Sequence, residues 1–232
     1  MIFSVPANIT AKTAAKLFIS GEMDLDTQWS FQTTQQILNE VLNLSIEELL
    51  QIVDQHKWGT QADVRYVPQF NNIDIFLKVP ECFSKMEQNC IDFAQLGFCL
   101  KNDPAARLDA NYKFGDNYGK PICTIGLANL TTGHINYSSI TEVFCSLDEL
   151  TKRKLVIRLF FRMPVIQMLL KESATKEYNG YSPIEHLKKS TRERRAASIR
   201  KILLWLHEEE SEALDERINR IVWNEIGCDQ DE

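Results

Sequence analysis

Residues 146–173 form a long and strongly apolar stretch, SLDELTKRKLVIRLFFRMPVIQMLLKES, which restricts the chain to folds that bury it. Ser146 followed by Glu149 is a capping-box pattern and predicts the start of a helix. Pro164 lacks a backbone N–H donor and predicts a kink or a split in that helix. No run approaches the roughly 18 consecutive apolar residues of a membrane span, so we expect no membrane partner.

Apolar residues at three- and four-residue spacing predict further helices. They occur over 13–21, 33–44, 90–101 and 103–115. A Ser45–Glu48 capping box predicts a further helix that starts at Ile46. Within 116–130, another helix is predicted to start near Lys120. Pro121 then occupies the first turn of that last helix, and residues 131–136 are expected to form a loop. The chain therefore reads as mainly α.

Two short segments, 63–67 and 73–79, are rich in β-branched and aromatic residues and flank the turn-forming PQFNN. Following two helices, they predict a winged helix-turn-helix within 10–80. Further along, Ser182, Pro183 and Glu185 predict a helix over 183–189, and Ser190 with Glu193 predicts a second over 191–207. Two helices joined this closely are typical of a helix-turn-helix.

The predicted fold is mainly α with small β-ribbons, as two winged helix-turn-helix-like units in tandem. The first unit covers 1–88, and the second, with its basic helix, covers 89–207. An acidic C-terminal helix or tail covers 208–232, where Leu214, Ile218 and Ile221 are spaced to pack on the parent domain.

The net charge of −6 conceals a basic segment. Residues 151–206 hold 14 Lys or Arg and 4 Asp or Glu, a balance of +10, whereas 1–150 and 207–232 each balance at −8. A basic segment between acidic ones is typical of a nucleic-acid contact. The alternative is that these cations cover solvated helix faces and pair with the acidic stretch 208–216.

Placed around a helix at about 100° per residue, the stretch STRERRAASIRKILLWL (190–206) has two sides. Ile199, Ile202, Leu203 and Leu206 face the core, and apolar residues all round predict that the helix is buried from Ile202 onward. Arg194, Ser198 and Lys201 are predicted to reach a DNA groove, with Ala197 permitting close approach. The remaining candidates are Arg192 and Arg195, which hold phosphates or stabilise the turn, and Thr191, Tyr118 and Lys120.

This stretch resembles the end of the winged-helix DNA-recognition modules found in many type II restriction endonucleases and related prokaryotic defence proteins. The corresponding residues are Ser190, Thr191, Arg194, Arg195, Ile199, Trp205 and Leu206. Upstream, KFGDNYGKPICTIGLAN is similar to the module's first helix-turn-helix at Lys113, Gly115, Asp116, Tyr118, Gly126 and Leu127. The resemblance covers about residues 90–207. It departs from the pattern at Phe114, Lys120, Pro121, Ser198 and Ile199.

The resemblance implies sequence-specific binding of double-stranded DNA, as the recognition part of a restriction or anti-phage defence system in the cytoplasm. Two alternatives remain. One is a non-catalytic interaction subunit that joins a nuclease or another defence-complex subunit. The other is a restriction nuclease using Asp63, Asp74 and Lys78. Three residues separate Asp74 from Lys78 where one is wanted, however, and a surface ion pair between these two fits better.

The sequence shows no catalytic motif and predicts no cofactor. The six cysteines are scattered without a CxxC pair, and the four histidines do not combine with them at zinc-ligand spacing. We therefore expect reduced thiols and no metal site.

Overall fold

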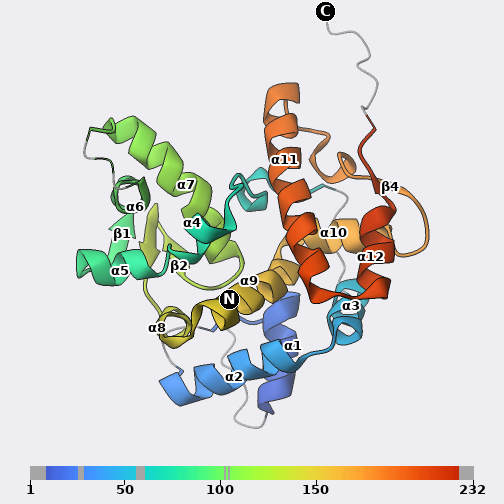
Figure 1. The fold of residues 1–232 in the computed structure, drawn as a ribbon, viewed down its shortest axis with the longest axis horizontal. Coiled ribbons are helices and arrows are strands. Elements are labelled where there is room, and N and C mark those ends of the chain that lie inside the picture. Colours follow the sequence, from blue (N-terminus) through green and yellow to red (C-terminus); the bar gives the residue numbers. More distant parts are fainter. Residues whose placement is uncertain (1–8, 26–28, 56–60, 102, 104, 225–232) are drawn as a thin grey trace, which may run out of the picture.

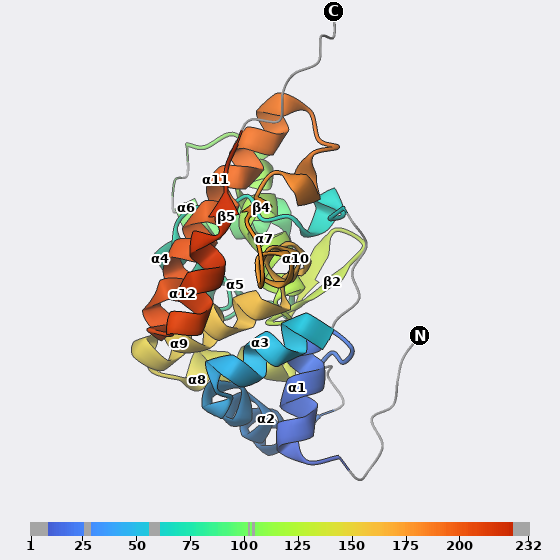
Figure 2. The ribbon, with the colours of Figure 1, turned by 90° about the vertical axis from the view of Figure 1, so that its right-hand side faces the viewer.

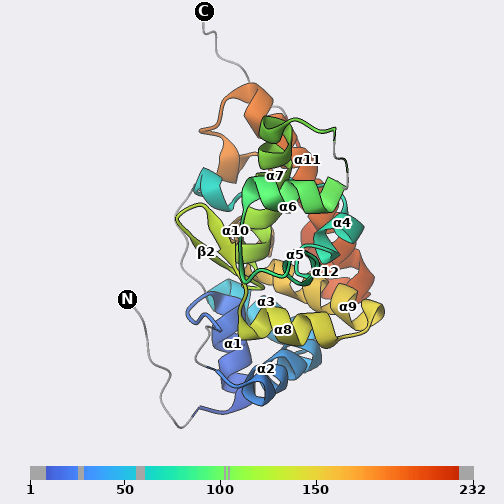
Figure 3. The ribbon, with the colours of Figure 1, turned by 90° about the vertical axis from the view of Figure 1, so that its left-hand side faces the viewer.

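The computed structural model describes residues 9–25, 29–55, 61–101, 103 and 105–224. These residues are mainly helical with two small sheets, which confirms the mainly α class. One cluster of buried hydrophobic side chains extends through all three predicted ranges, from Ala14 to Ile221. Figures 1 and 3 show α9 (Glu149–Leu159) with the helices of residues 11–43 below it and the helices of residues 93–124 and 189–206 above it.

The three N-terminal helices follow the predicted ranges. They are α1 (Ala11–Ser20), α2 (Phe31–Asn43) and α3 (Ile46–Gln55). The Ser45–Glu48 capping box is confirmed: the Glu48 amide donates to Ser45 Oγ and the Ser45 amide donates to a Glu48 carboxylate oxygen, each at 3.2 Å.

The β-ribbon predicted over 63–79 is wrong. The chain forms the 3-10 turn η1 (Val64–Tyr66) and the short helix α4 (Ile73–Leu77), followed by α5 (Glu81–Met86). Asp63 accepts a hydrogen bond from the Arg65 amide at 2.9 Å, and Asn72 Oδ1 accepts from the Asp74 and Ile75 amides at 2.9 and 3.1 Å. These local caps favour helical turns over the strands that the β-branched residues indicated.

A three-stranded antiparallel sheet lies further along the chain, where a helix end and a loop were predicted. Its strands are β1 (Cys90–Asp92), β2 (Asn129–Thr131) and β3 (His134–Asn136), in the spatial order β1-β3-β2. Thr132 and Gly133, with φ of 48° and 80°, make the tight turn between β2 and β3. Two consecutive left-handed residues are what a two-residue hairpin loop requires.

Two closely packed helices, α6 (Phe93–Lys101) and α7 (Leu108–Thr124), lie between β1 and β2. The predicted break near Lys120 is wrong, because α7 continues through Pro121 and buries both Pro121 and Ile122. Glycines make the contact with α6 possible: a Cβ on Gly97 would lie 1.9 Å from Asn111 O, and one on Gly115 would lie 1.8 Å from Phe93 O. This packing outweighs the local cost of the proline.

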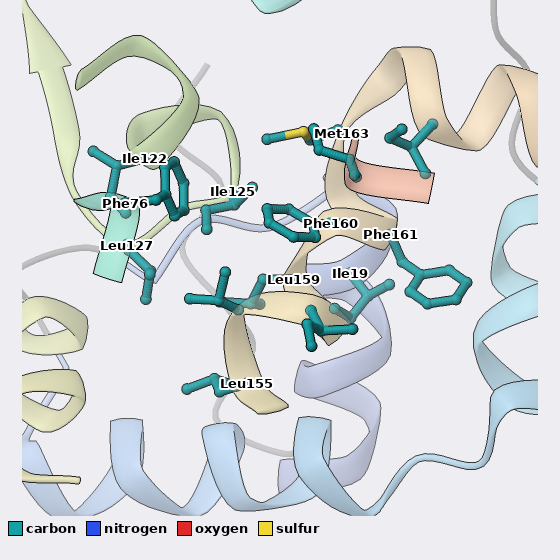
Figure 4. Close-up of a cluster of buried hydrophobic side chains, with 14 of the residues drawn as sticks. Ile19, Phe76, Ile122, Ile125, Leu127, Leu155, Leu159, Phe160, Phe161 and Met163 are labelled. Atoms are coloured by element: carbon teal, nitrogen blue, oxygen red, sulfur yellow. The ribbon is translucent and has the colours of Figure 1, made fainter. Parts of the chain in front are cut away.

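The apolar stretch of 146–173 is split at Pro164, as predicted. It forms α9, the 3-10 turn η2 (Phe160–Arg162) and α10 (Pro164–Glu172). The predicted cap is wrong: Ser146 ends α8 (Ser139–Ser146), and Asp148 caps α9 by accepting from the Thr151 amide at 3.0 Å. Figure 4 shows Leu155, Leu159 and Phe160 directed into the core together with residues of α1, α4 and α7.

The C-terminal part holds the longest helix. Its elements are β4 (Tyr178–Asn179), the 3-10 turn η3 (Ser182–Ile184), α11 (Lys189–Leu206), η4 (His207–Glu209), α12 (Glu212–Asn219) and β5 (Ile221–Val222), which pairs in parallel with β4. The helix predicted over 183–189 is only one 3-10 turn, because the backbone of Lys188 is extended, with ψ of 142°. Leu214 and Ile221 are buried, so this end packs on the rest of the protein as expected.

Replacing Arg158 by alanine should lower the free energy of unfolding by about 3–5 kcal/mol. Arg158 pairs at 2.8 Å with Glu209, both side chains are under a tenth exposed, and its Nη1 donates to the Val41 and Leu44 carbonyls. Removal leaves a buried carboxylate without its cation. Urea unfolding of Arg158→Ala measures the loss. Leu150→Ala, at a side chain 78% exposed on the same helix, is the control, and equal losses would contradict the prediction.

Candidate nucleic-acid interface

The helix α11 has one buried and one exposed side. Ile199, Ile202, Leu203 and Leu206 are buried, as predicted, while Arg194, Ala197 and Lys201 are exposed. The C-terminal half is not covered all round, because Leu204 is 58% exposed. Figures 1 and 2 show the first turns of α11 reaching beyond the neighbouring helices at the top of the molecule.

The start of α11 differs from the prediction. It begins at Lys189, one residue before the predicted cap Ser190, and its N-cap residue Lys188 makes no side-chain capping bond. The Thr191 and Arg192 amides both donate to Lys188 O at 2.9 Å. A helix start without a side-chain cap presents backbone N–H groups and the positive end of the helix dipole.

The exposed cations around this start, Lys188, Lys189, Arg194 and Lys201, are here called the basic front, together with the exposed small residues Ser190 and Ala197. Glu193 is an exposed carboxylate on the same turns. Lys188 and Lys189 are not among the predicted contacts, because the helix was expected to start after Ser190. The signal for them in the sequence is the pair of lysines directly before the predicted helix.

Several cations elsewhere in the basic segment are neutralised by carboxylates. Lys152 pairs with Glu149 at 2.8 Å, Arg153 with Glu208 at 2.5 Å and Arg158 with Glu209 at 2.8 Å. By contrast, no described carboxylate forms an ion pair with any Lys or Arg of residues 188–201. The acidic stretch 208–216 therefore pairs with α9 and with its own neighbours, and pairing between it and α11 is ruled out in this structure.

Arg195 has a structural position. Its Nη1 donates to Val67 O. With the side-chain amide of Gln69 oriented to suit its neighbours, the amide oxygen accepts from Arg195 Nε at 3.0 Å and the amide nitrogen donates to Asn117 Oδ1 at 2.9 Å. The side chain thus joins α11 to the segment after η1 and to α7. Burial, followed by the neighbouring charge of Arg194, lowers the pKa of Arg195 to about 10. A half-buried guanidinium with these partners is not available to a ligand.

Arg192 stabilises the turn before α11, one of the two roles predicted for it. It donates to Glu185 O at 3.2 Å, and its guanidinium lies 5.8 Å from the centre of the Tyr181 ring. Arg200 approaches the same ring, donates to Tyr181 Oη at 3.2 Å and lies 4.5 Å from the Trp223 ring centre. The predicted candidate Thr191 is partly exposed next to this cluster.

Two predicted contact residues are buried and a third is paired with a carboxylate. Ser198 is 3% exposed and lies about 60° from Arg195 around the helix. Tyr118 is also 3% exposed, with its ring centre 5.9 Å from that of Phe70. Lys120 pairs with Asp116 at 2.6 Å and lies over the Phe93 ring.

The residues considered for a nuclease centre are engaged separately. Asp63 forms a two-atom contact with Arg65, Asp74 approaches Arg153 at 3.6 Å, and Lys78 follows the last residue of α4. The Asp74–Lys78 alternation argument does not apply, since the segment is helical. Among the described residues, no three His, Cys, Asp or Glu side chains gather as a metal site requires.

The five described cysteines are free thiols, and Cys228 and His56 lie outside the described residues. No helix in the described part of the chain is long and apolar enough to cross a membrane. No protein-family model, no curated protein and no solved structure matches this chain.

Two adjacent arginines should respond differently to replacement by alanine. Arg195→Ala should lower the free energy of unfolding by about 1–3 kcal/mol, because the Val67 carbonyl and the Gln69 amide lose their donor. Arg194→Ala, at an exposed side chain, should change it by less than about 0.5 kcal/mol. Urea unfolding monitored by circular dichroism measures both. A larger loss for Arg194→Ala would refute this assignment of roles.

Proposed function

We propose that the protein binds double-stranded DNA through the basic front of α11. The observation that carries the proposal is the distribution of ion pairs: three of the four cations of α9, Lys152, Arg153 and Arg158, pair with carboxylates, while those of residues 188–201 have no such partner among the described residues. Unpaired, exposed cations on a projecting helix attract a polyanion and release its counterions on binding.

The shape of the basic front fits a DNA groove. Arg194 and Lys201 lie about 20° apart around the helix, and the small side chain of Ala197 lies on the same side. An α-helix enters the major groove, where arginine reads the O6 and N7 acceptors of guanine. At the front end, Lys188, Lys189 and the free helix N–H groups suit phosphates. Arg194 is thus the proposed base-reading residue, and the lysines are the proposed phosphate contacts.

The order of elements supports a winged helix-turn-helix, in a different place from that predicted. Residues 81–136 run α5, β1, α6, α7, β2 and β3, with the sheet order β1-β3-β2. We propose that they form one such unit and that η3 with α11 forms the second of the tandem. In the first unit, Lys120 pairs with Asp116 and Arg107 with Asp109. The charge distribution therefore favours α11 over α7 as the DNA-contacting helix.

The resemblance to restriction-enzyme recognition modules suggests the biological setting of this binding. We propose a cytoplasmic DNA-recognition protein of a restriction or anti-phage defence system, with any cleavage performed by a partner nuclease subunit. The competing function is a protein-interaction subunit that does not bind DNA. It predicts association with a protein partner, and the affinity of that association should not depend on counterion release.

Binding to a labelled duplex of random sequence, measured by fluorescence anisotropy across a salt series, tests the proposal. With the four cations of the basic front in contact, log K should fall linearly with log salt with a slope of roughly −3 to −4. Arg194→Glu should weaken binding roughly tenfold or more and flatten the slope by about 1 or more.

The matched control is Lys154→Glu, which reverses an exposed charge on α9, away from the basic front. This variant should keep the affinity and the salt slope of the parent protein. Equal weakening by both substitutions would assign the binding to net charge alone, and absence of binding by folded protein at low salt would overturn the proposal.

A further inference from the structure

A pair of aromatic rings lies beside α11, next to the basic front. Tyr181 lies two residues after the end of β4 and Trp223 directly follows β5. The two rings meet edge to face, with their centres 5.3 Å apart. Figure 2 shows the two strands beside α11. None of the DNA contacts proposed above uses this pair of rings.

The backbone fixes the position of both rings. Gly180 permits the close approach, because a Cβ at this residue would lie 2.7 Å from the Trp223 ring. The Gly180 amide donates to Val222 O at 2.8 Å, and the Tyr181 amide donates to Asn179 Oδ1 at 3.0 Å. An incoming ligand therefore meets the rings in a preformed arrangement.

The side chain of Arg200 is held against these rings. Its guanidinium carbon lies 4.5 Å from the centre of the Trp223 ring and 5.8 Å from that of the Tyr181 ring, and its Nη2 donates to Tyr181 Oη at 3.2 Å. Contact with an aromatic face restricts a guanidinium without using its N–H donors. Tyr181 Oη is the one acceptor that Arg200 reaches among the described residues, so most of its five donors stay free on an exposed side chain.

Arg200 differs in this from the arginines outside α11. In the described part of the chain, each of those seven pairs with a carboxylate; they are Arg65, Arg107, Arg153, Arg158, Arg162, Arg217 and Arg220. Glu193 is exposed on the same side of α11 as Arg200, but it lies about 10 Å away along the helix axis. The guanidinium fork of Arg200 is therefore open to an anion from outside, which it can bind with two N–H groups.

Tyr181 supplies a second donor at the same place. Because its Oη accepts the hydrogen bond from Arg200, its own O–H remains to be donated, and no described acceptor takes it. Arg200 Nη2 and Tyr181 Oη lie 3.2 Å apart, so two oxygen atoms of one anion can accept from both residues.

The position of Arg200 around α11 indicates which anion it meets. At about 100° per residue, Arg200 lies about 60° from Ala197 and about 100° from Lys201. A helix with its side chains is about 10–12 Å across and the major groove is about 12 Å wide. Side chains next to the groove-facing side therefore lie against the strand at the edge of the groove, which presents phosphodiesters.

We infer that Arg200 and Tyr181 form a phosphate-binding site for the DNA strand that borders α11, with Trp223 positioning the guanidinium. The inference rests on the proposed DNA binding and adds a fifth cation to the four of the basic front. A phosphate contact fixes the register of a protein on the duplex and does not read its sequence. The contribution of Arg200 is therefore the same on every sequence.

Duplex binding across a salt series tests this contact. Arg200→Ala should weaken binding roughly tenfold and flatten the slope of log K against log salt by about 0.9, the share of one phosphate. The loss should be equal on duplexes of different sequence, whereas the loss in Arg194→Ala should depend on the sequence. Arg200→Lys, which keeps the charge and loses the fork, should bind with intermediate affinity, and Tyr181→Phe should lose less than Arg200→Ala.

The matched control is Arg65→Ala. The guanidinium of Arg65 also lies 5.8 Å from the centre of a tyrosine ring, that of Tyr66, but Arg65 pairs with Asp63. This substitution changes the net charge by the same amount as Arg200→Ala. It should leave both the duplex affinity and the salt slope unchanged.

The NMR signals of the arginine Nε–H groups test the phosphate chemistry without DNA. The signal of Arg200 is assigned by its absence from the spectrum of Arg200→Lys. It should shift with millimolar inorganic phosphate and not with sodium chloride of the same ionic strength, and the signal of Arg65 should not shift.

The inference and the DNA proposal fail separately. If Arg200→Ala binds the duplex like Arg65→Ala while Arg194→Glu loses affinity, the phosphate site is overturned and the DNA proposal stands. If the folded parent protein binds no duplex, the DNA proposal is overturned. A phosphate-dependent shift of Arg200 then assigns the site to a free phosphate compound, and absence of that shift overturns the site as well.

Discussion

Two buried arginines satisfy the carbonyl groups at the C-terminal ends of the first two helices, and the rest of the fold is arranged around them. Arg162 donates to Phe18 O of α1 and Arg158 to Val41 O and Leu44 O at the end of α2. Gln167 extends the pattern by donating to Ile19 O at 3.1 Å. Cations at helix C-termini stabilise the dipole and the unpaired carbonyls together. The central segment α9–η2–α10 thereby holds α1 and α2 against the core.

This arrangement determines how charge is distributed over the surface. Glu209 and Glu208 of the acidic segment are held by Arg158 and Arg153 of α9. They are therefore not available to α11, and the basic front keeps its charge in an acidic protein.

Part of the candidate site could be predicted from the amphipathic pattern of α11. The pattern distinguishes Arg194 and Lys201 from Ile199 and Ile202 because the helix period depends only on neighbouring residues. It does not identify the side of the helix that a distant loop covers. Arg195 donates to Val67 O, 128 residues away in the sequence, and Tyr118 lies in an aromatic cluster with Phe70.

The sequence by itself determined the features that act over about four residues: the Ser45–Glu48 cap, the split at Pro164 and the buried stripe of α11. Tertiary structure decided the features that depend on distant partners. Close glycine contacts with α6 keep α7 helical through Pro121, and pairing with β1 makes strands of 129–136. The free or neutralised state of each cation also depends on tertiary structure, because Arg153 and Arg158 find their carboxylates 55 and 51 residues away.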